Sequence, residues 1–214
     1  MNPETLNQLL PPSDRSQRVH GVVVGIVTNN KDPDNRHRVK VRFPWLDPDN
    51  ESNWARVATF MAGNNRGGYF LPEVDDEVLV AFEHGDVNFP YVVGSLWNGV
   101  DKAPESNSDG LNKHRTIKSR SGHIIRLNDK AGTETIEIID KTGNNKIIIS
   151  SKDNTITIES MSDITINSKT GKLKMSAIGI EMNSKAGVKI DAAANIDISA
   201  NALVNVKGAL IKLN

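Results

Sequence analysis

Apolar residues in the last third of the chain come in pairs separated by one residue, and the pairs return at steps of 8, 9, 7, 8, 8, 8 and 7 residues. Side chains at positions i and i+2 lie on one face of a β-strand. Each repeat therefore predicts a short strand with two core-facing residues, followed by a turn of small or polar residues. The paired positions are Ile156, Ile158, Ile164, Ile166, Leu173, Met175, Ile180, Met182, Val188, Ile190, Ile196, Ile198, Val204, Val206, Ile211 and Leu213.

Two inward side chains per strand cannot bury each other, so the repeat needs further walls around it. Left-handed β-helices and calcium-binding β-rolls repeat every six or nine residues, and neither spacing fits. An antiparallel meander would favour Asn-Gly or Asp-Gly turns, which the connections "SKTG", "DAAA" and "SANA" lack, and would leave one apolar face in water. The pattern favours a β-prism in which three identical chains intertwine, with the paired residues as the trimer core. An irregular single-chain sheet is the alternative.

Residues 18–100 carry a different pattern, with short strand signals between Gly, Pro, Asn and Asp turns. The stretch "HRVKVRF" alternates, so Val39, Val41 and Phe43 are expected to face inward and the basic residues between them outward. Five such stretches predict an OB-like five-stranded barrel. All ten aromatic residues of types Trp, Tyr and Phe lie between residues 43 and 97, so a conventional core is expected in this half alone.

The predicted fold class is all-β, with an N-terminal OB-like barrel followed by a C-terminal intertwined trimeric β-helix. Residues 1–17 are polar and contain a Pro-Pro pair, which suggests an arm that docks on a hub. Residues 18–100 form the barrel, residues 101–120 are a polar linker, and residues 121–214 are the octad-repeat needle. Two earlier apolar pairs, Ile136/Ile138 and Ile147/Ile149, have the same form at a looser spacing.

Charge and composition exclude several classes of protein. Basic and acidic side chains balance at 26 each, so the chain has no global attraction for nucleic acid or anionic lipid. It contains no cysteine, which excludes disulfides and thiolate metal sites. The start lacks a basic region followed by an apolar one, so we expect no signal peptide and assembly in the cytoplasm. The longest apolar run, at 21–27, is too short to span a bilayer.

The first half resembles the barrel domain of phage baseplate spike proteins and of VgrG proteins of type VI secretion systems. The resemblance rests on "RVKVRFPW", "WARV", "FLPEVDDEVLVAF", "EHGD" and "PYVVGSLWNG" together. A repetitive β tail directly behind such a barrel is also the order found in that family. The residues that carry the family motif here are Phe43, Pro44, Trp45, Trp54, Pro72, Glu77, Gly85, Asp86, Pro90 and Gly94.

The resemblance implies a trimeric spike whose barrel is the shoulder and whose β-prism is the needle. It also implies a PAAR-type tip protein at the C-terminus and allows effector cargo. Only about 17 residues precede the barrel, so a separate hub or tube adaptor is expected to hold the barrel end. A linker of this length leaves no room for a lysozyme domain. The residues expected to dock the tip protein are Leu210, Ile211, Lys212, Leu213 and Asn214.

The remaining polar motifs indicate turns or solvent-facing strands. The acids of "PEVDDEVLVAFEHGD" lack the aromatic platform of a glycosidase, although paired carboxylates suit that chemistry. "GNNRGG" lacks the Lys-Ser/Thr ending of a P-loop, and the five histidines have no metal-ligand spacing. A basic stripe suits the binding of single-stranded nucleic acid, but the nearby aromatic residues belong to packing motifs. The residues of the stripe are Arg36, Arg38, Lys40 and Arg42. We expect no catalytic residue, cofactor or metal site.

These observations lead to one functional hypothesis and two alternatives. The hypothesis is a non-enzymatic homotrimeric spike of a phage tail, secretion apparatus or extracellular injection particle. It pierces a target envelope when the sheath contracts and contacts the membrane transiently. The first alternative is a trimeric tail-fibre-type protein that binds or degrades glycans. The second is an OB-fold nucleic-acid binder.

Overall fold

The computed structural model describes residues 18–212, with the backbone alone at 47–49. The chain divides into two units, one ending at Asp163 and the other beginning at Ile164. Every strand lies in the first unit, and the part of the chain from 18 to 212 contains no α-helix. The class is therefore all-β, as the sequence predicts.

The barrel domain is a six-stranded sheet in the order β3-β2-β1-β7-β8-β4. A backbone bridge between Val39 and Ala55 joins the segments that lead into β2 and β4, so the sheet curls back on itself. This curled sheet is consistent with the OB-like barrel that the sequence predicts. Its strands are β1 (Val22–Asn29), β2 (Lys40–Phe43), β3 (Asp47–Glu51), β4 (Arg56–Val57), β7 (Glu77–Phe82) and β8 (Pro90–Ser95).

Two smaller elements complete this domain. A two-stranded hairpin, β5 (Ala62–Gly63) and β6 (Arg66–Gly67), lies between β4 and β7 in the sequence. A short 3₁₀ turn, η2 (Glu83–Gly85), connects β7 to β8. The "GNNRGG" stretch is therefore a connection between strands, and Asn65 at its turn has a positive φ of 53°.

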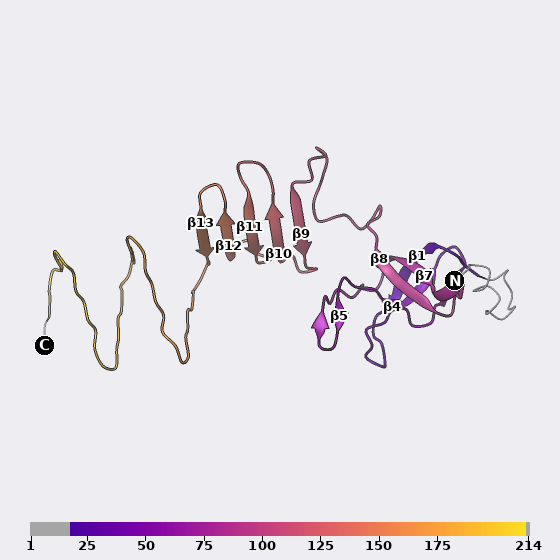
Figure 1. The fold of residues 1–214 in the computed structure, drawn as a ribbon, viewed down its shortest axis with the longest axis horizontal. Coiled ribbons are helices and arrows are strands. Elements are labelled where there is room, and N and C mark those ends of the chain that lie inside the picture. Colours follow the sequence, from indigo (N-terminus) through magenta and orange to yellow (C-terminus); the bar gives the residue numbers. More distant parts are fainter. Residues whose placement is uncertain (1–17, 213–214) are drawn as a thin grey trace, which may run out of the picture. The chain divides into compact units, whose positions relative to one another are not determined.

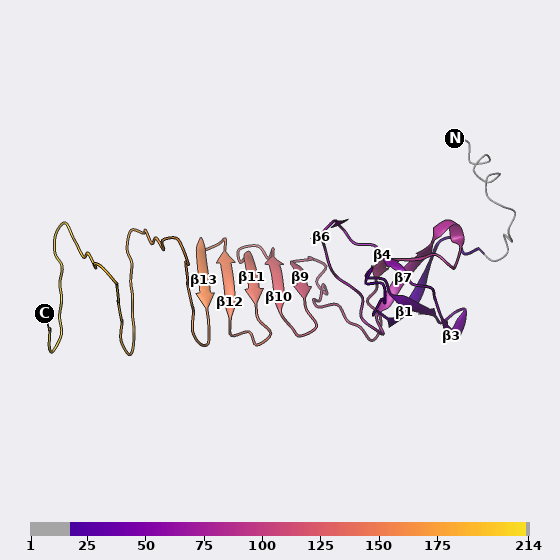
Figure 2. The same ribbon diagram turned by 90° about the horizontal axis from the view of Figure 1, so that it is seen from below.

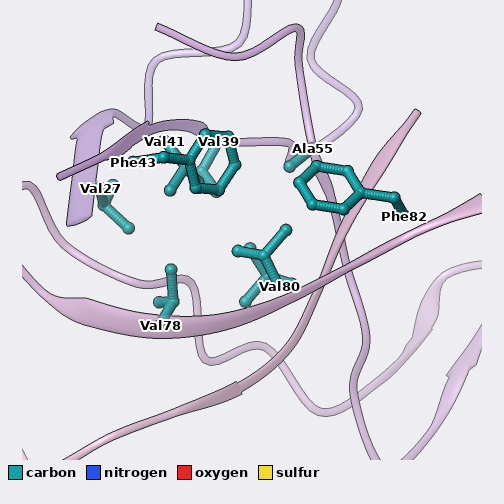
Figure 3. Close-up of a cluster of buried hydrophobic side chains, with 9 residues drawn as sticks. Val27, Val39, Val41, Phe43, Ala55, Val78, Val80 and Phe82 are labelled. Atoms are coloured by element: carbon teal, nitrogen blue, oxygen red, sulfur yellow. The ribbon is translucent and has the colours of Figure 1, made fainter. Parts of the chain in front are cut away.

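The barrel core consists of small aliphatic residues and two phenylalanines, shown in Figure 3. Val39, Val41 and Phe43 are all buried, which confirms the alternation predicted for "HRVKVRF". The Phe43 and Phe82 rings meet edge to face, with centroids 5.5 Å apart. Gly25 lets β1 pass close to β2, because a Cβ there would lie 2.3 Å from Cγ1 of Val41.

A second, five-stranded sheet follows in the order β13-β12-β11-β10-β9, with every neighbouring pair antiparallel. Figures 1 and 2 show these strands as a simple meander. The expectation that no part of the repeat forms a meander is therefore wrong for this segment. The strands are β9 (His114–Lys118), β10 (Ile124–Asn128), β11 (Thr135–Ile139), β12 (Lys146–Ser150) and β13 (Thr155–Glu159).

Strand β9 also lies within residues 101–120, where the sequence suggests a linker. Its residues read as polar because a single isoleucine, Ile117, stands among charged neighbours. The strand forms because its backbone pairs with β10 over five residues, and its polar side chains find partners on one face of the sheet.

The second unit, described from 164 to 212, contains no strand, and its chain runs back and forth (Figures 1 and 2). All of these described residues are exposed, including the apolar pairs. The intertwined β-prism predicted for this segment needs two further chains, so it stays a prediction.

Candidate functional site

One face of the β9–β13 sheet is aliphatic apart from Arg115 of β9, which lies opposite Leu127. The strand register places Ile117, Ile125, Ile138, Ile147 and Ile158 side by side as one row. A second row beside it contains the other four members of what we term the aliphatic face: Leu127, Ile136, Ile149 and Ile156.

The aliphatic face is open to solvent in the single chain. Its nine side chains are between 39% and 71% exposed. Burying a whole aliphatic side chain stabilises a protein by about 1.5–3 kcal/mol, so covering what remains exposed here corresponds to roughly 10 kcal/mol per chain. A contiguous apolar patch of this kind marks an interaction surface.

The opposite face of the same sheet is mostly polar, although it includes Ile124, Ile139 and Ile148, and many of its charged groups pair with one another. Arg126 lies between Thr116 and Glu137 on the neighbouring strands, and its guanidinium contacts the Glu137 carboxylate at 3.2 Å and that of Glu105 at 2.9 Å. Hydrogen bonds from Thr116 and then His114 lower the pKa of Glu105. Because this face satisfies its own charges, it suits contact with water, whereas the aliphatic face requires a cover.

The turns of the meander explain why strands of one chain can pair directly. Gly122, Gly132, Gly143 and Asn154 take positive φ angles, one in each of the four turns. In the β11–β12 turn the Asp140 carboxylate accepts hydrogen bonds from the backbone of Asn145 and the hydroxyl of Thr142. These bonds, the first above all, lower the pKa of Asp140 to about 2.

The paired positions predicted as trimer core extend from the edge of this sheet into the second unit. Ile156 and Ile158 are in β13 and belong to the aliphatic face. The thirteen pair members between 164 and 211 are 49% to 71% exposed, whereas three aliphatic residues outside the pairs, Ile178, Leu203 and Leu210, are at least 74% exposed. Ile211 and Lys212 of the predicted tip are also exposed, and Leu213 and Asn214 lie outside the described residues.

Sequence reasoning missed part of the aliphatic face. Ile117, Ile125 and Leu127 were not among the predicted core positions, although Ile125 and Leu127 also stand at i and i+2. The signal was present, but the turns between these strands are longer than in the octads. The period therefore did not reveal it.

Most of the barrel motif residues serve packing or turns. Phe43, Pro72 and Pro90 are buried, and Trp54 is half-buried. Gly85 has φ +78°, with His20 and Arg18 within 3.3 Å of where a Cβ would lie. Asp86 accepts two hydrogen bonds from Asn88, and Glu77 accepts one from Asn98. Pro44 and Trp45 are exposed, and no side chain approaches the Cβ position of Gly94.

The basic stripe runs from the loop before β2 into β2, and its two middle members are neutralised. Arg38 forms a two-pronged ion pair with Asp32, at 2.7 and 2.8 Å, and reaches Asp34 at 2.8 Å. The Arg38 partner holds the pKa of Asp32 far below its usual range. Lys40 pairs with Glu51 at 3.0 Å, and Arg38 and Lys40 both lie over the ring of Trp54. Two of the four cations of this stripe, Arg38 and Lys40, therefore already have carboxylate partners.

Other candidate chemistry finds no assembled site. Of the acids in the "PEVDDEVLVAFEHGD" stretch, Asp76 accepts the backbone N–H of Glu73, and Glu83 accepts the hydroxyl of Tyr91. Over residues 18–212, no group of three or more His, Asp or Glu side chains is placed to hold a metal ion. The same stretch contains no helix both long and apolar enough to cross a membrane.

Comparison with known proteins shows what the barrel is similar to. Residues 23–97 match the model of the type VI secretion system/phage-baseplate injector OB domain. The chain is 34% identical to the type VI secretion system spike protein VgrG3 of Vibrio cholerae over 111 residues, which is 48% of this chain and 11% of the relative.

Two relatives from Pseudomonas aeruginosa extend the match. VgrG1c is 34% identical over 129 residues, which cover 55% of this chain and 18% of that protein. VgrG5 is 32% identical over 142 residues, which cover 59% of this chain and 18% of that protein. The chain thus spans less than a fifth of the length of these spike proteins, and the aligned stretches are longer than the barrel match.

Proposed function

We propose that this chain, whose residues 23–97 match the model of the type VI secretion system/phage-baseplate injector OB domain, is the central spike subunit of a contractile injection machine and acts as a homotrimer. The observation that carries the proposal is the aliphatic face of the β9–β13 sheet, continued by the exposed apolar pairs of residues 164–211. Both features need a cover, which identical neighbours around one axis would supply.

Three copies of the sheet can enclose one core. Each sheet contributes a single apolar face, and its opposite face carries the Glu105–Arg126–Glu137 network that tolerates water. If three sheets stand around an axis with their aliphatic faces inward, every isoleucine row meets two others in a closed prism. Two sheets would form an open sandwich; the number three is what the likeness to VgrG and phage baseplate spikes implies.

The needle then has two kinds of wall. In residues 114–159, strands of one chain pair with each other, so each chain supplies one complete wall. In residues 164–212, the described chain has no strand partner within itself, although the octads predict strands. We propose that these strands pair with strands of the two other copies, which satisfies their backbone groups and intertwines the chains.

This architecture suits mechanical work. A continuous apolar core and strands paired around the axis leave few edges to fray, so the needle resists bending when it is driven into an envelope. The barrel would sit on a hub or tube adaptor, and the exposed end near Leu210 and Ile211 would receive a PAAR-type tip protein. The proposal includes no catalytic step, so purified protein is expected to show no turnover of glycans.

Imaging of the purified full chain tests the proposal. Negative-stain electron microscopy should show thin rods with a wider end, each rod containing three copies. Compact round particles, or sustained glycan cleavage by the pure protein, would instead favour the tail-fibre alternative or a different fold for the second half.

A further inference from the structure

A hollow of about 590 Å³ lies between the β5–β6 hairpin, strand β4 and the loop that precedes β2. The three segments come from separate parts of the sequence, so the hollow exists only in the folded barrel. Its walls combine basic and aromatic side chains; those on which the argument depends are Arg36, His37, Arg56, Arg66, Tyr69 and Phe70.

The charge of this hollow is entirely positive. Three guanidinium groups line it, and none of the residues that line it is acidic. Arg66 has no hydrogen bond or ion pair with any described residue, and the Arg36 guanidinium reaches only Asp34, at 4.0 Å, with both side chains more than half exposed. Arg56 lies over the ring of Tyr91, which leaves its N–H donors unused. Arg38, by contrast, donates from Nε and Nη2 to carboxylates, so this hollow has spare capacity for an anion that Arg38 lacks.

The aromatic rings at the rim favour a peptide over a nucleobase. His37 and Tyr69 meet edge to face at 5.2 Å, and Phe60 and Phe70 are tilted against each other at 6.3 Å. Because the rings within each pair are steeply inclined to each other, they do not present parallel faces on which successive bases stack. Their edges can still contact one apolar side chain of a peptide whose neighbouring residues carry carboxylates.

We propose that this hollow binds an acidic peptide segment of a partner protein, with carboxylates on Arg56 and Arg66 and one apolar side chain against Tyr69 and Phe70. Arginine suits this ligand because its planar fork can bind a carboxylate through two hydrogen bonds. The acidic turn of this chain itself is an unsuitable occupant, because Asp76 and Glu77 already accept hydrogen bonds. The inference goes beyond the spike proposal and does not depend on it, since every residue involved lies between 36 and 71.

Fluorescence anisotropy with the purified full chain tests this site. The probe is a fluorescein-labelled pentapeptide of four glutamates around a central phenylalanine. A glutamine version of the peptide and a labelled oligothymidylate serve as comparison ligands. The protein variants are Arg56→Gln and Arg66→Gln. The matched control is Arg115→Gln, which removes an exposed arginine of β9 that is paired with Asp129.

We expect the acidic peptide to bind, and each hollow variant to weaken it about tenfold, because a charge-assisted pair is lost. Arg115→Gln should leave the affinity unchanged, and all variants should keep the thermal unfolding midpoint of the parent. The inference is overturned if the parent fails to bind the acidic peptide, if it binds the glutamine peptide equally well, or if the oligothymidylate binds more tightly. Equal weakening by Arg115→Gln would overturn it as well.

Discussion

Replacing Ile147 with lysine should dissociate the proposed trimer. Ile147 lies in the first row of the aliphatic face, where its neighbours across the sheet are Ile138 on β11 and Ile158 on β13. In the prism this position faces a closed apolar layer, so three ammonium groups would share it without a partner. Because the sequence has no cysteine, no disulfide can hold the variant chains together.

The expected magnitude follows from the cost of an unpaired buried charge. Each such charge costs about 3–5 kcal/mol, so three copies cost about 9–15 kcal/mol per trimer. A trimer that assembles at micromolar concentration gains about 8 kcal/mol in each of two association steps. Ile147→Lys therefore removes more than half of the association free energy and should raise the assembly concentration by about three orders of magnitude or more.

The matched control is the same substitution one residue further along β12. Ile148 lies opposite Glu137, on the polar face of the sheet. Ile148→Lys places its ammonium beside that carboxylate and should leave the trimer intact, with a stability change of about 1 kcal/mol at most. Sedimentation equilibrium over a concentration series, with circular dichroism to follow β content, separates the two variants. If Ile147→Lys assembles and melts as the parent does, the aliphatic face does not line the core.

Three further predictions concern other parts of the chain. Ile196→Asp combined with Ile198→Asp should abolish trimers in gel filtration, because six carboxylates would share one apolar layer; persistence of the trimer would show that these octad residues point outward. The lowered pKa of Asp140 means that its carboxylate stabilises the fold above pH 4, and that this contribution is lost as the pH falls towards 2. The thermal midpoint of Asp140→Asn should accordingly fall less between pH 5 and pH 2 than that of the parent, and parallel curves would contradict this. Gly25→Ala should destabilise the barrel by about 1–3 kcal/mol in chemical unfolding, because its Cβ would overlap Val41, and an unchanged midpoint would show that β1 can move away.

The barrel could be predicted from sequence because its signals are local and strong. Alternation around Val39, Val41 and Phe43 identifies an inward face without knowledge of the neighbours, and all three residues are buried in the structure. The closure of the sheet was harder to predict, because Ala55, which lies just before the two-residue strand β4, pairs with Val39 through a single bridge.

The meander was harder to predict than the octads, for a physical reason. Its turns are not two-residue hairpins: they are longer loops in which Gly132, Gly143 or Asn154 takes a positive φ and carboxylates such as Asp140 bind the loop backbone. Such loops vary in length, so the apolar pairs of 114–149 lose the even spacing that made the later repeat visible. The spacing of the apolar pairs therefore predicted one architecture for residues 121–214. In the structure, strands pair within the chain up to residue 159, and residues 164–212 contain no strand.

The basic hollow could not be derived from sequence at all. Arg36, Arg56 and Arg66 are separated by other strands, and their meeting depends on where the β5–β6 hairpin lies. Arg36 and Arg38 stand two residues apart in the same basic stretch, yet only Arg38 is occupied by carboxylates. Which arginine is available for a ligand is a property of the fold.

The native mass of the full chain tests the central claim most directly. Light scattering at micromolar concentration should give three copies of the 23.4-kDa chain, about 70 kDa in total, with no change on moderate dilution. A well-folded single chain of 23.4 kDa under the same conditions would contradict the claim, because the aliphatic face would then be stable in water without any partner.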